Sequence, residues 1–182
     1  MDGESRNYQS QMKKGLILGR FQPLHLGHLN VIHEVIKEKL GPIICIGSSQ
    51  EGNTLNNPFT SQERKDMIKT LLSKLDVEYE IYEIPDIHNN ERYVAHLETF
   101  VPDFDVVYSG NALVQRLFRE AGHGVVIPKF VNREVWKGAA IRRAMLEDDD
   151  WESAVPRQIV GIVHNLNGTE RLKNLSSAGP SQ

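Results

Sequence analysis

Short apolar runs alternate with helical patterns along most of the chain, and this alternation constrains the fold more than any other feature. Apolar runs of roughly four to eight residues are typical of strands that are buried on both faces. Helices between such strands carry the chain back across the sheet, so successive strands lie parallel. We therefore expect an α/β fold, a Rossmann-like doubly wound parallel sheet of about five strands with helices on both faces.

The same pattern predicts where the elements lie. Apolar runs predict strands at 15–19, 42–47, 77–84, 105–108 and 125–127. Helical spacing predicts helices at about 29–40, 60–75, 92–100 and 111–122. Thr60 and Glu63 form a capping-box pattern, and Asn111 is well suited to cap the helix that follows it. From about residue 138 the spacing is mostly helical, which predicts a C-terminal helical segment after the sheet.

Length and composition indicate one globular domain. The chain has 182 residues, of which 40% are hydrophobic and 25% are charged, as is ordinary for a protein with one core. Residues 1–11 and 176–182 are polar, so we expect disordered tails on either side of a domain that spans 12–175. The net charge of −3 argues against a generic nucleic-acid binder, which usually carries a basic face.

The single cysteine and the absence of long apolar runs bear on location. Cys45 lies in the apolar run 43–46, so we interpret it as a core residue rather than a nucleophile. One cysteine also excludes an internal disulfide. No stretch approaches the roughly 18 apolar residues of a membrane span, and residues 1–11 lack the apolar core of a signal peptide. We expect a cytoplasmic protein without a membrane partner.

Polar residues gather in the loops that follow the expected strands. In a doubly wound sheet, ligands bind beyond the carboxyl ends of the strands, at the point where the strand order reverses. The loop after the first strand carries Arg20, Gln22, His25 and His28. The two histidines are three residues apart at a helix start, so their rings project from nearly the same side.

This first loop has the chemistry of a phosphate site. A helix start offers unpaired N–H groups and a partial positive charge, and Arg20 adds a full charge. Gly27 leaves room for a ligand to approach the backbone, and Pro23 fixes the turn into the helix. Two alternatives remain open. The histidines cap the helix or fill a gap, or they bind zinc, although no third ligand is obvious nearby.

The segment His25-Leu26-Gly27-His28 matches the H-x-G-H signature of the nucleotidyltransferase superfamily. The wider sequence resembles the archaeal-type nicotinamide-nucleotide adenylyltransferases from Lys14 to Leu175. H-x-G-H alone specifies only the superfamily, whereas the ordered set of motifs is much more specific. The matching segments are 19–28, 46–50, 57–64, 84–87, 108–111, 114–118 and 167–171.

The resemblance implies an enzyme that joins nicotinamide mononucleotide (NMN) to the adenylyl group of ATP, giving NAD and pyrophosphate. The attacking phosphate oxygen is already largely ionised at neutral pH, so no general base is required. Catalysis then rests on positioning and on stabilising charge. By resemblance, the catalytic residues are His25, His28, Arg20 and Arg142. Mg²⁺ would be held mainly by the ATP phosphates, so we assign no protein ligand to a metal.

The resemblance also assigns the two substrate sites. The ATP-binding residues it implies are Gly19, Arg20, Phe21, Gln22, His25, Gly27, His28, Gly110, Asn111, Lys137, Gly138, Ile141 and Arg142. The NMN-binding residues it implies are Ser48, Gln50, Asp86, Asn90 and Tyr93. Tyr93 would stack on the nicotinamide ring, where relatives more often have Trp. The alternative for Tyr93 is a core residue of its own helix.

One segment departs from the family pattern. Archaeal-type members usually read S-G-T-x-[IV]-R-R near the C-terminal phosphate site, whereas this chain reads Lys137-Gly138-Ala139-Ala140-Ile141-Arg142-Arg143. Arg142 falls on the phosphate-binding arginine, but two hydroxyl groups are missing. Lys137 can supply charge instead, as a point donor. Arg143 is interpreted as a solvated residue of the helix face.

Other functions stay open from the sequence. A pantetheine-phosphate adenylyltransferase belongs to the same superfamily, and the acceptor that releases pyrophosphate from ATP would distinguish it. A nucleotide-binding regulator without catalysis is a further alternative, motivated by Ala139. Nicotinate mononucleotide is a second candidate acceptor. The resemblance also implies a homo-oligomer, since such relatives are often hexamers.

Overall fold

Five parallel strands form one sheet in the computed structural model, which describes residues 12–129, 132 and 134–178. The strands are β1 (Lys14–Gly19), β2 (Gly41–Ile46), β3 (Glu80–Glu83), β4 (Val106–Tyr108) and β5 (Gly124–Val126). Their order across the sheet is β3-β2-β1-β4-β5, and every neighbouring pair is parallel. The order reverses at β1, so the loops after β1 and β4 flank the switch point.

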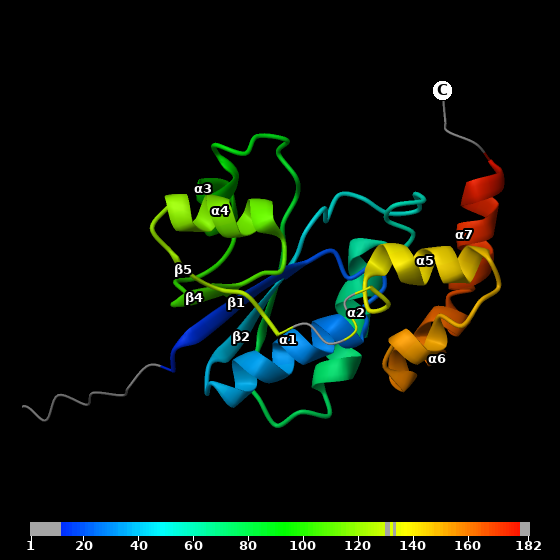
Figure 1. Ribbon diagram of the computed structural model, residues 1–182, viewed down its shortest axis with the longest axis horizontal. Coiled ribbons are helices and arrows are strands. Elements are labelled where there is room, and N and C mark those ends of the chain that lie inside the picture. The colour runs from blue at the N-terminus through cyan, green and yellow to red at the C-terminus, as the bar shows by residue number, and fades with distance from the viewer. Residues whose placement is uncertain (1–11, 130–131, 133, 179–182) are drawn as a thin grey trace, which may run out of the picture.

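Helices cover both faces of this sheet (Figure 1). On one face lie α1 (Leu26–Lys37) and α2 (Ser61–Leu72), and on the other lie α3 (Tyr93–Glu98) and α4 (Ala112–Glu120). The segment after the sheet contains α5 (Gly138–Leu146), a 3-10 turn (Glu152–Ala154), α6 (Arg157–Asn165) and α7 (Gly168–Ser177). These last helices pack beside α2 at one end of the sheet.

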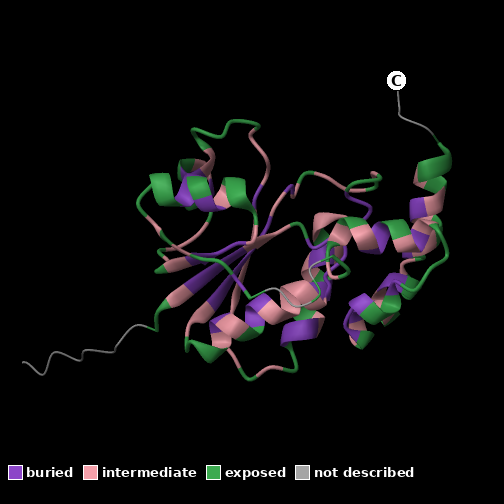
Figure 2. Cartoon of the chain, viewed as in Figure 1, coloured by how far each residue is buried: buried purple, intermediate pink, exposed green. Residues whose placement is uncertain are grey.

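Successive strand residues point to opposite faces and supply two cores. Ile17 and Ile44 pack with α1, α2 and the C-terminal helices, whereas Leu16 and Ile43 pack with α3 and α4. The central strands are therefore buried on both sides, as Figure 2 shows. Burial on both faces explains why these strands are continuous apolar runs rather than alternating ones.

The sequence predicted this architecture correctly. The five strands and the C-terminal helical segment are present, and both expected caps are formed. Thr60 accepts from the Glu63 backbone N–H while the Glu63 side chain accepts from the Thr60 N–H. The Asn111 side chain accepts from two backbone N–H groups of α4. Cys45 is fully buried, and burial raises the pKa of its thiol to about 12, in agreement with a core residue.

Some boundaries differ from the prediction. The third strand begins at Glu80 rather than at residue 77, because only 80–83 pair with β2. Helix α1 begins at Leu26, so the whole H-x-G-H segment lies at its start. Helix α7 includes residues 176 and 177, which were expected to belong to a tail. The tail predicted at 1–11 and residues 179–182 lie outside the described residues.

Within the described ranges, no helix is long and apolar enough to cross a membrane.

Candidate active site

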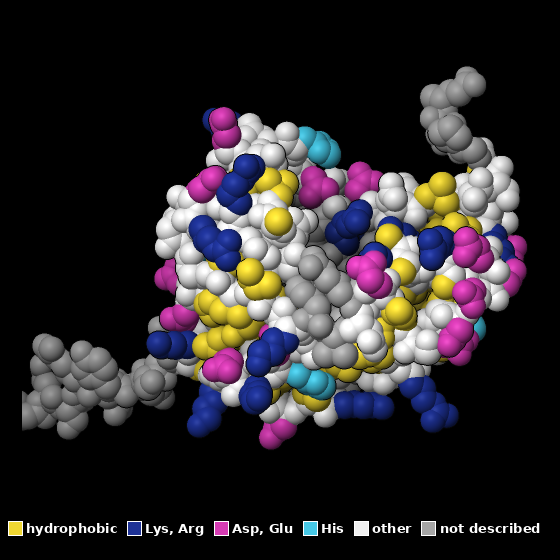
Figure 3. Space-filling view, viewed as in Figure 1, with side chains coloured by type: hydrophobic (Ala, Val, Ile, Leu, Met, Phe, Trp, Pro, Cys, Tyr) yellow, Lys and Arg dark blue, Asp and Glu magenta, His cyan; other side chains and the backbone are white. Residues whose placement is uncertain are grey.

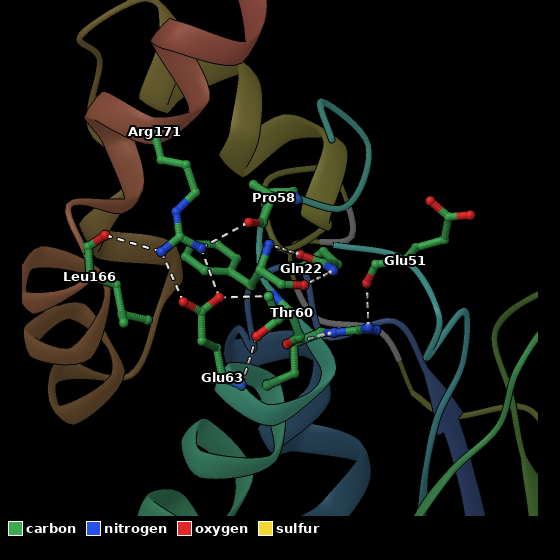
Figure 4. Close-up of polar contacts among 9 residues, drawn as sticks. Gln22, Glu51, Pro58, Thr60, Glu63, Leu166 and Arg171 are labelled. Carbon is green, nitrogen blue, oxygen red and sulfur yellow. Dashed lines mark hydrogen bonds and ion pairs between the residues drawn. The ribbon is translucent and has the colours of Figure 1, made fainter. Parts of the chain in front are cut away.

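The loop between β1 and α1 is held rigidly by buried contacts. Phe21 is fully buried and lies in the left-handed region, with φ of 53°. The Gln22 side chain bonds both backbone groups of Phe59, donating to its carbonyl at 2.7 Å and accepting from its N–H at 2.9 Å. Figure 4 shows Gln22 between Glu51 on one side and the group of Thr60, Glu63 and Arg171 on the other. The first loop is therefore fixed against the segment that starts α2.

The two histidine rings are stacked at the start of α1. The ring centroids of His25 and His28 lie 3.7 Å apart, and the Phe21 ring lies 4.4 Å from that of His28. The His28 Nδ1 atom accepts from the His25 backbone N–H at 3.3 Å, so His28 does cap the helix. In the neutral ring the proton then lies on Nε2. Capping and ligand binding are therefore compatible uses of the two nitrogens.

Both imidazoles are neutral at physiological pH in this structure. Burial, followed by the positive charge of Arg142, lowers the pKa of His25 to about 3. Burial and the neighbouring His25 lower the pKa of His28 well below its ordinary value. His25 is only 7% exposed, and its Nδ1 atom has no partner among the described residues. A buried polar atom of this kind is most stable when a ligand bonds it.

The start of α5 faces the first loop through Arg142. This side chain is 8% exposed, and its Nη1 donates to the Gln22 carbonyl at 2.8 Å. Burial, followed by repulsion from Arg20, lowers the pKa of Arg142, but a guanidinium stays charged at neutral pH. Arg20 itself is exposed. Arg142 therefore places a positive charge beside His25, and Arg20 lies close enough to Arg142 to repel it.

Three glycines are needed where these groups come close. A side chain on Gly19 would approach the His28 Nε2 atom to 3.1 Å, and one on Gly138 would approach Arg142 Nη1 to 3.0 Å. At Gly27 a side chain would lie 2.8 Å from the Trp136 carbonyl oxygen and 2.9 Å from His25 Nδ1. The side-chain position of Gly27 is therefore taken by protein atoms, and the approach of a ligand to its backbone stays a prediction.

Several residues expected to bind ATP have their side chains engaged elsewhere. Phe21 and Ile141 are core residues, and the buried Gln22 amide uses one N–H and its oxygen to bond the Phe59 backbone. The Lys137 ammonium pairs with the Glu134 carboxylate at 2.6 Å. That ion pair competes with the compensating phosphate contact we expected from Lys137. Arg143 is exposed and lies 3.8 Å from Glu147, as expected for a solvated helix face.

The residues assigned to the NMN side form a second cluster. The Gln50 side chain accepts from the Asp86 N–H at 3.0 Å, which joins the loops after β2 and β3. Tyr93 begins α3, and its N–H donates to the Asn90 carbonyl at 3.3 Å. Its ring meets Phe118 edge-on, with centroids 6.5 Å apart. Burial, with a smaller contribution from Asp86, raises the Tyr93 pKa.

Tyr93 packs as a core residue, and its stacking on the nicotinamide ring stays a prediction. The ring packs against the core between the sheet and α4, yet the residue is only half-buried. Ser48 is 8% exposed and adopts a left-handed conformation, with φ of 48°. Gly110 and Asn111 follow β4 next to the switch point, where the Asn111 Oδ1 atom is occupied in capping α4. The Asn111 NH₂ group is what this side chain can offer to a nucleotide.

Arg64 is the residue of this region that sequence reasoning missed. It is fully buried in the first turn of α2 and reaches the loops after β1 and β2. Burial lowers its pKa to about 10, so it is charged at neutral pH. A basic residue directly after a capping box is typical of a solvated helix start, so nothing in the local pattern indicates burial.

The chain is similar to known nucleotidyltransferases over nearly its full length. The cytidylyltransferase-like family model matches residues 16–177. A nicotinamide-nucleotide adenylyltransferase from Archaeoglobus fulgidus is 44% identical, over 90% of this chain and 97% of that protein. One from Methanococcus aeolicus is 41% identical, over 90% and 95%. One from Thermoplasma acidophilum is 40% identical, over 91% and 93%.

A solved structure supports the fold independently. A bifunctional NMN adenylyltransferase/ADP ribose pyrophosphatase from Francisella tularensis, in complex with AMP and a manganese ion, superposes with a TM-score of 0.66. The match covers 91% of this chain but 52% of that protein, so this chain spans about half of it. At 17% identity the likeness concerns the fold alone.

Proposed function

Because this chain belongs to the nicotinamide-nucleotide adenylyltransferase family, we propose that it makes NAD and pyrophosphate from ATP and NMN by in-line phosphoryl chemistry. An oxygen of the NMN phosphate attacks the α-phosphorus of ATP. The new bond joins the two nucleotides, and the bond from the α-phosphorus to the pyrophosphate oxygen breaks. No proton has to be removed from the nucleophile, because that phosphate is already ionised.

The observation that carries the proposal is the stacked, neutral histidine pair at the start of α1, with Arg142 reaching across from α5. Neutral imidazoles donate directed hydrogen bonds without the cost of burying two further cations. His28 offers Nε2–H, and His25 offers its buried ring nitrogen, to the phosphate oxygens of ATP. Arg20 and Arg142 supply the charge that stabilises the transferred group and the leaving pyrophosphate.

The cluster of Gln50, Asp86 and Tyr93 suits the NMN side. A half-buried aromatic ring beside a carboxylate fits a flat, positively charged nicotinamide ring. We assign Ser48 and Asn90 to the same site as lining residues. Gly110 and Asn111 lie at the switch point and are assigned to the adenine and ribose.

Mg²⁺ remains a prediction for this reaction. In the described part of the chain, no group of three or more His, Cys, Asp or Glu side chains could hold a metal ion. The phosphate oxygens of ATP, together with water, are the natural ligands for Mg²⁺ in such a site, where the ion neutralises charge on the leaving group.

Incubation with ATP, Mg²⁺ and NMN tests the proposal, with NAD and pyrophosphate measured separately. We expect both products in equal amounts. Nicotinate mononucleotide in place of NMN measures acceptor preference, and phosphopantetheine tests the other member of the superfamily. Tight ATP binding without turnover of any acceptor would instead support the regulator alternative.

Assembly and location are further predictions. We expect a homo-oligomer, which light scattering coupled to size-exclusion chromatography measures directly, and a cytoplasmic location. On the face seen in Figure 3, basic and acidic side chains are interspersed rather than separated.

A further inference from the structure

The Arg64 side chain, in α2, makes more hydrogen bonds to the substrate loops than any other described side chain. Nothing in its motif assigns it a function. Its five hydrogen bonds use all five guanidinium N–H groups, and each goes to a backbone carbonyl oxygen. The acceptors are Arg20 at 3.1 Å, Gly47 at 2.8 Å, Ser48 and Glu51 at 3.0 Å each, and Thr60 at 3.2 Å. A guanidinium offers five donors in a fixed plane, so this set saturates it.

Four of these carbonyls belong to two loops that serve different substrates. The Arg20 carbonyl lies in the loop with the histidine pair, and the carbonyls of Gly47, Ser48 and Glu51 lie in the loop with Gln50. The Gly47 N–H also donates to the Gly19 carbonyl at 2.9 Å. One buried side chain therefore joins the ATP loop to the NMN loop.

Both loops adopt an unfavourable backbone conformation next to the carbonyl groups that Arg64 binds. Ser48 has φ of 48°, and Phe21, which directly follows the Arg20 carbonyl, has φ of 53°. Residues other than glycine rarely adopt such angles, and they keep them only where surrounding contacts enforce them. The hydrogen bonds of Arg64 are among the contacts that enforce both backbone conformations.

We propose that Arg64 is a positioning residue that fixes the two substrate loops relative to each other and so aligns the NMN phosphate with the α-phosphorus of ATP. It touches neither substrate, and it acts through the backbone of Arg20 and Ser48. This inference rests on the proposed function. A displacement of about 1 Å in reacting groups can cost about 100-fold in rate, so the geometry of the loops is a sensitive quantity.

Two variants of Arg64 separate geometry from charge. Arg64→Lys keeps the charge but has only three donors at a single point, which cannot span carbonyls of both loops. Arg64→Met removes both the charge and the hydrogen-bond donors. Arg171→Met is the matched control, because Arg171 also anchors the start of α2, through Glu63 at 2.7 Å and the Pro58 carbonyl at 3.1 Å. Among the described residues, Arg171 makes no hydrogen bond to the parts of the substrate loops that Arg64 binds, residues 20 and 47–51; its Pro58 acceptor lies at the far end of the loop after β2, next to α2.

The variants are compared by steady-state kinetics with each substrate varied in turn, and by calorimetric titration with ATP alone and NMN alone. All measurements are made well below each melting temperature. For Arg64→Lys and Arg64→Met we expect kcat/KM to fall about 100-fold and the KM of both substrates to rise. Arg171→Met lowers the melting temperature but keeps kcat and both KM values near those of the parent.

Guanidinium chloride at millimolar concentration should partly restore the activity of Arg64→Ala, whereas sodium chloride at equal ionic strength should not. Parental kinetics in a folded Arg64→Lys variant would overturn the proposal, and so would an equal loss in Arg171→Met. If Arg64→Met does not fold, Arg64→Lys decides alone. A parent protein that binds ATP but makes no NAD refutes the proposed function. The ATP titration of Arg64→Lys still tests, in that case, whether Arg64 positions the ATP loop.

Discussion

The two helix starts to which we assign the ATP phosphates are built in opposite ways. At α1, His25 and His28 stack on each other, and Gln22 ties the preceding loop to Phe59. At α5, the N-cap Lys137 makes no capping hydrogen bond with its side chain, and its ammonium pairs with Glu134. Ala139 in the first turn is exposed and has no hydroxyl. The start of α1 therefore has side chains fixed in place, whereas the start of α5 contributes a charge through Arg142.

Under the proposed function, this difference separates two tasks of one phosphate site, recognition of ATP and stabilisation of developing charge. The α1 start holds directed hydrogen-bond donors in fixed positions, which serves recognition of the ATP phosphates. The α5 start brings a charge whose effect grows as negative charge develops on the leaving group. Arg142 connects the tasks, because its guanidinium bonds the Gln22 carbonyl of the first loop at 2.8 Å.

The largest expected effect comes from His28→Ala at the rigid start. We expect kcat to fall about 100- to 1000-fold, as on loss of one directed donor to a developing charge, while the fold persists. NAD formation at saturating ATP measures the rate, and circular dichroism checks the fold. His33→Ala is the control, since His33 is exposed on the same helix. Full activity of His28→Ala at saturating ATP would show that the pair is structural.

Arg142→Ala should have the next largest effect, about 100-fold on kcat. We expect the affinity for ATP to change far less than the rate, because Arg142 stabilises charge that develops in the transition state. Single-turnover kinetics and ATP titration give the two quantities separately. Arg143→Ala, a neighbouring exposed arginine, should behave like the parent. An unchanged turnover number in Arg142→Ala would remove α5 from the catalytic machinery.

The neutral state of His25 gives a smaller effect that depends on pH. The unfolded chain takes up a proton near pH 6.5, whereas folded His25 takes one up only near its pKa of about 3. Unfolding therefore binds protons in this window, and stability is complete above pH 6.5 and falls as pH drops towards 3. The slope contributed by this one group is at most about 1.4 kcal/mol per pH unit.

Urea unfolding of the parent and of His25→Gln at several values between pH 4.5 and pH 7.5 measures this slope. The variant should lose less stability on acidification than the parent. Identical slopes for the parent and His25→Gln would mean that His25 is solvated and charged in the folded state. The α5 start carries no histidine, so the measurement reports on the first start alone.

Ala139→Thr should have the smallest effect and sharpens the comparison directly. A hydroxyl in the first turn of α5 adds a phosphate donor, so we expect activity to be preserved or raised, by about two- to tenfold on the scale of one hydrogen bond. Ala139→Val supplies the same shape without the hydroxyl and should give no gain. A large loss in Ala139→Thr alone would indicate that the site has been rebuilt around Lys137.

The sequence predicted the elements well because their signals are local. Thr60 and Asn111 cap helices with the residues next to them in the chain, and buried strands reveal themselves as apolar runs. The sequence also predicted correctly which loops lie together, because the carboxyl ends of parallel strands meet at one edge of the sheet. The pairing of Gln50 with Asp86 is an example.

The details that the sequence did not indicate depend on contacts between distant segments. Gln22 looked like a ligand-facing residue of a polar loop, but its amide finds Phe59, 37 residues away. Gly27 is needed because the Trp136 carbonyl approaches from beyond β5. The same holds for Arg64, whose five acceptors are spread over three segments. No local rule of spacing reports such contacts, because they form only after the sheet has assembled.

The protein should react slowly with thiol reagents, because its single cysteine is Cys45. It is the single cysteine of the chain, it is fully buried, and burial raises its pKa to about 12. Maleimides react with the thiolate, which this residue does not supply at neutral pH. A cysteine introduced on the exposed side of α1, in place of His33, would therefore be the only site labelled. A fluorophore there would follow ATP binding in an otherwise native sequence.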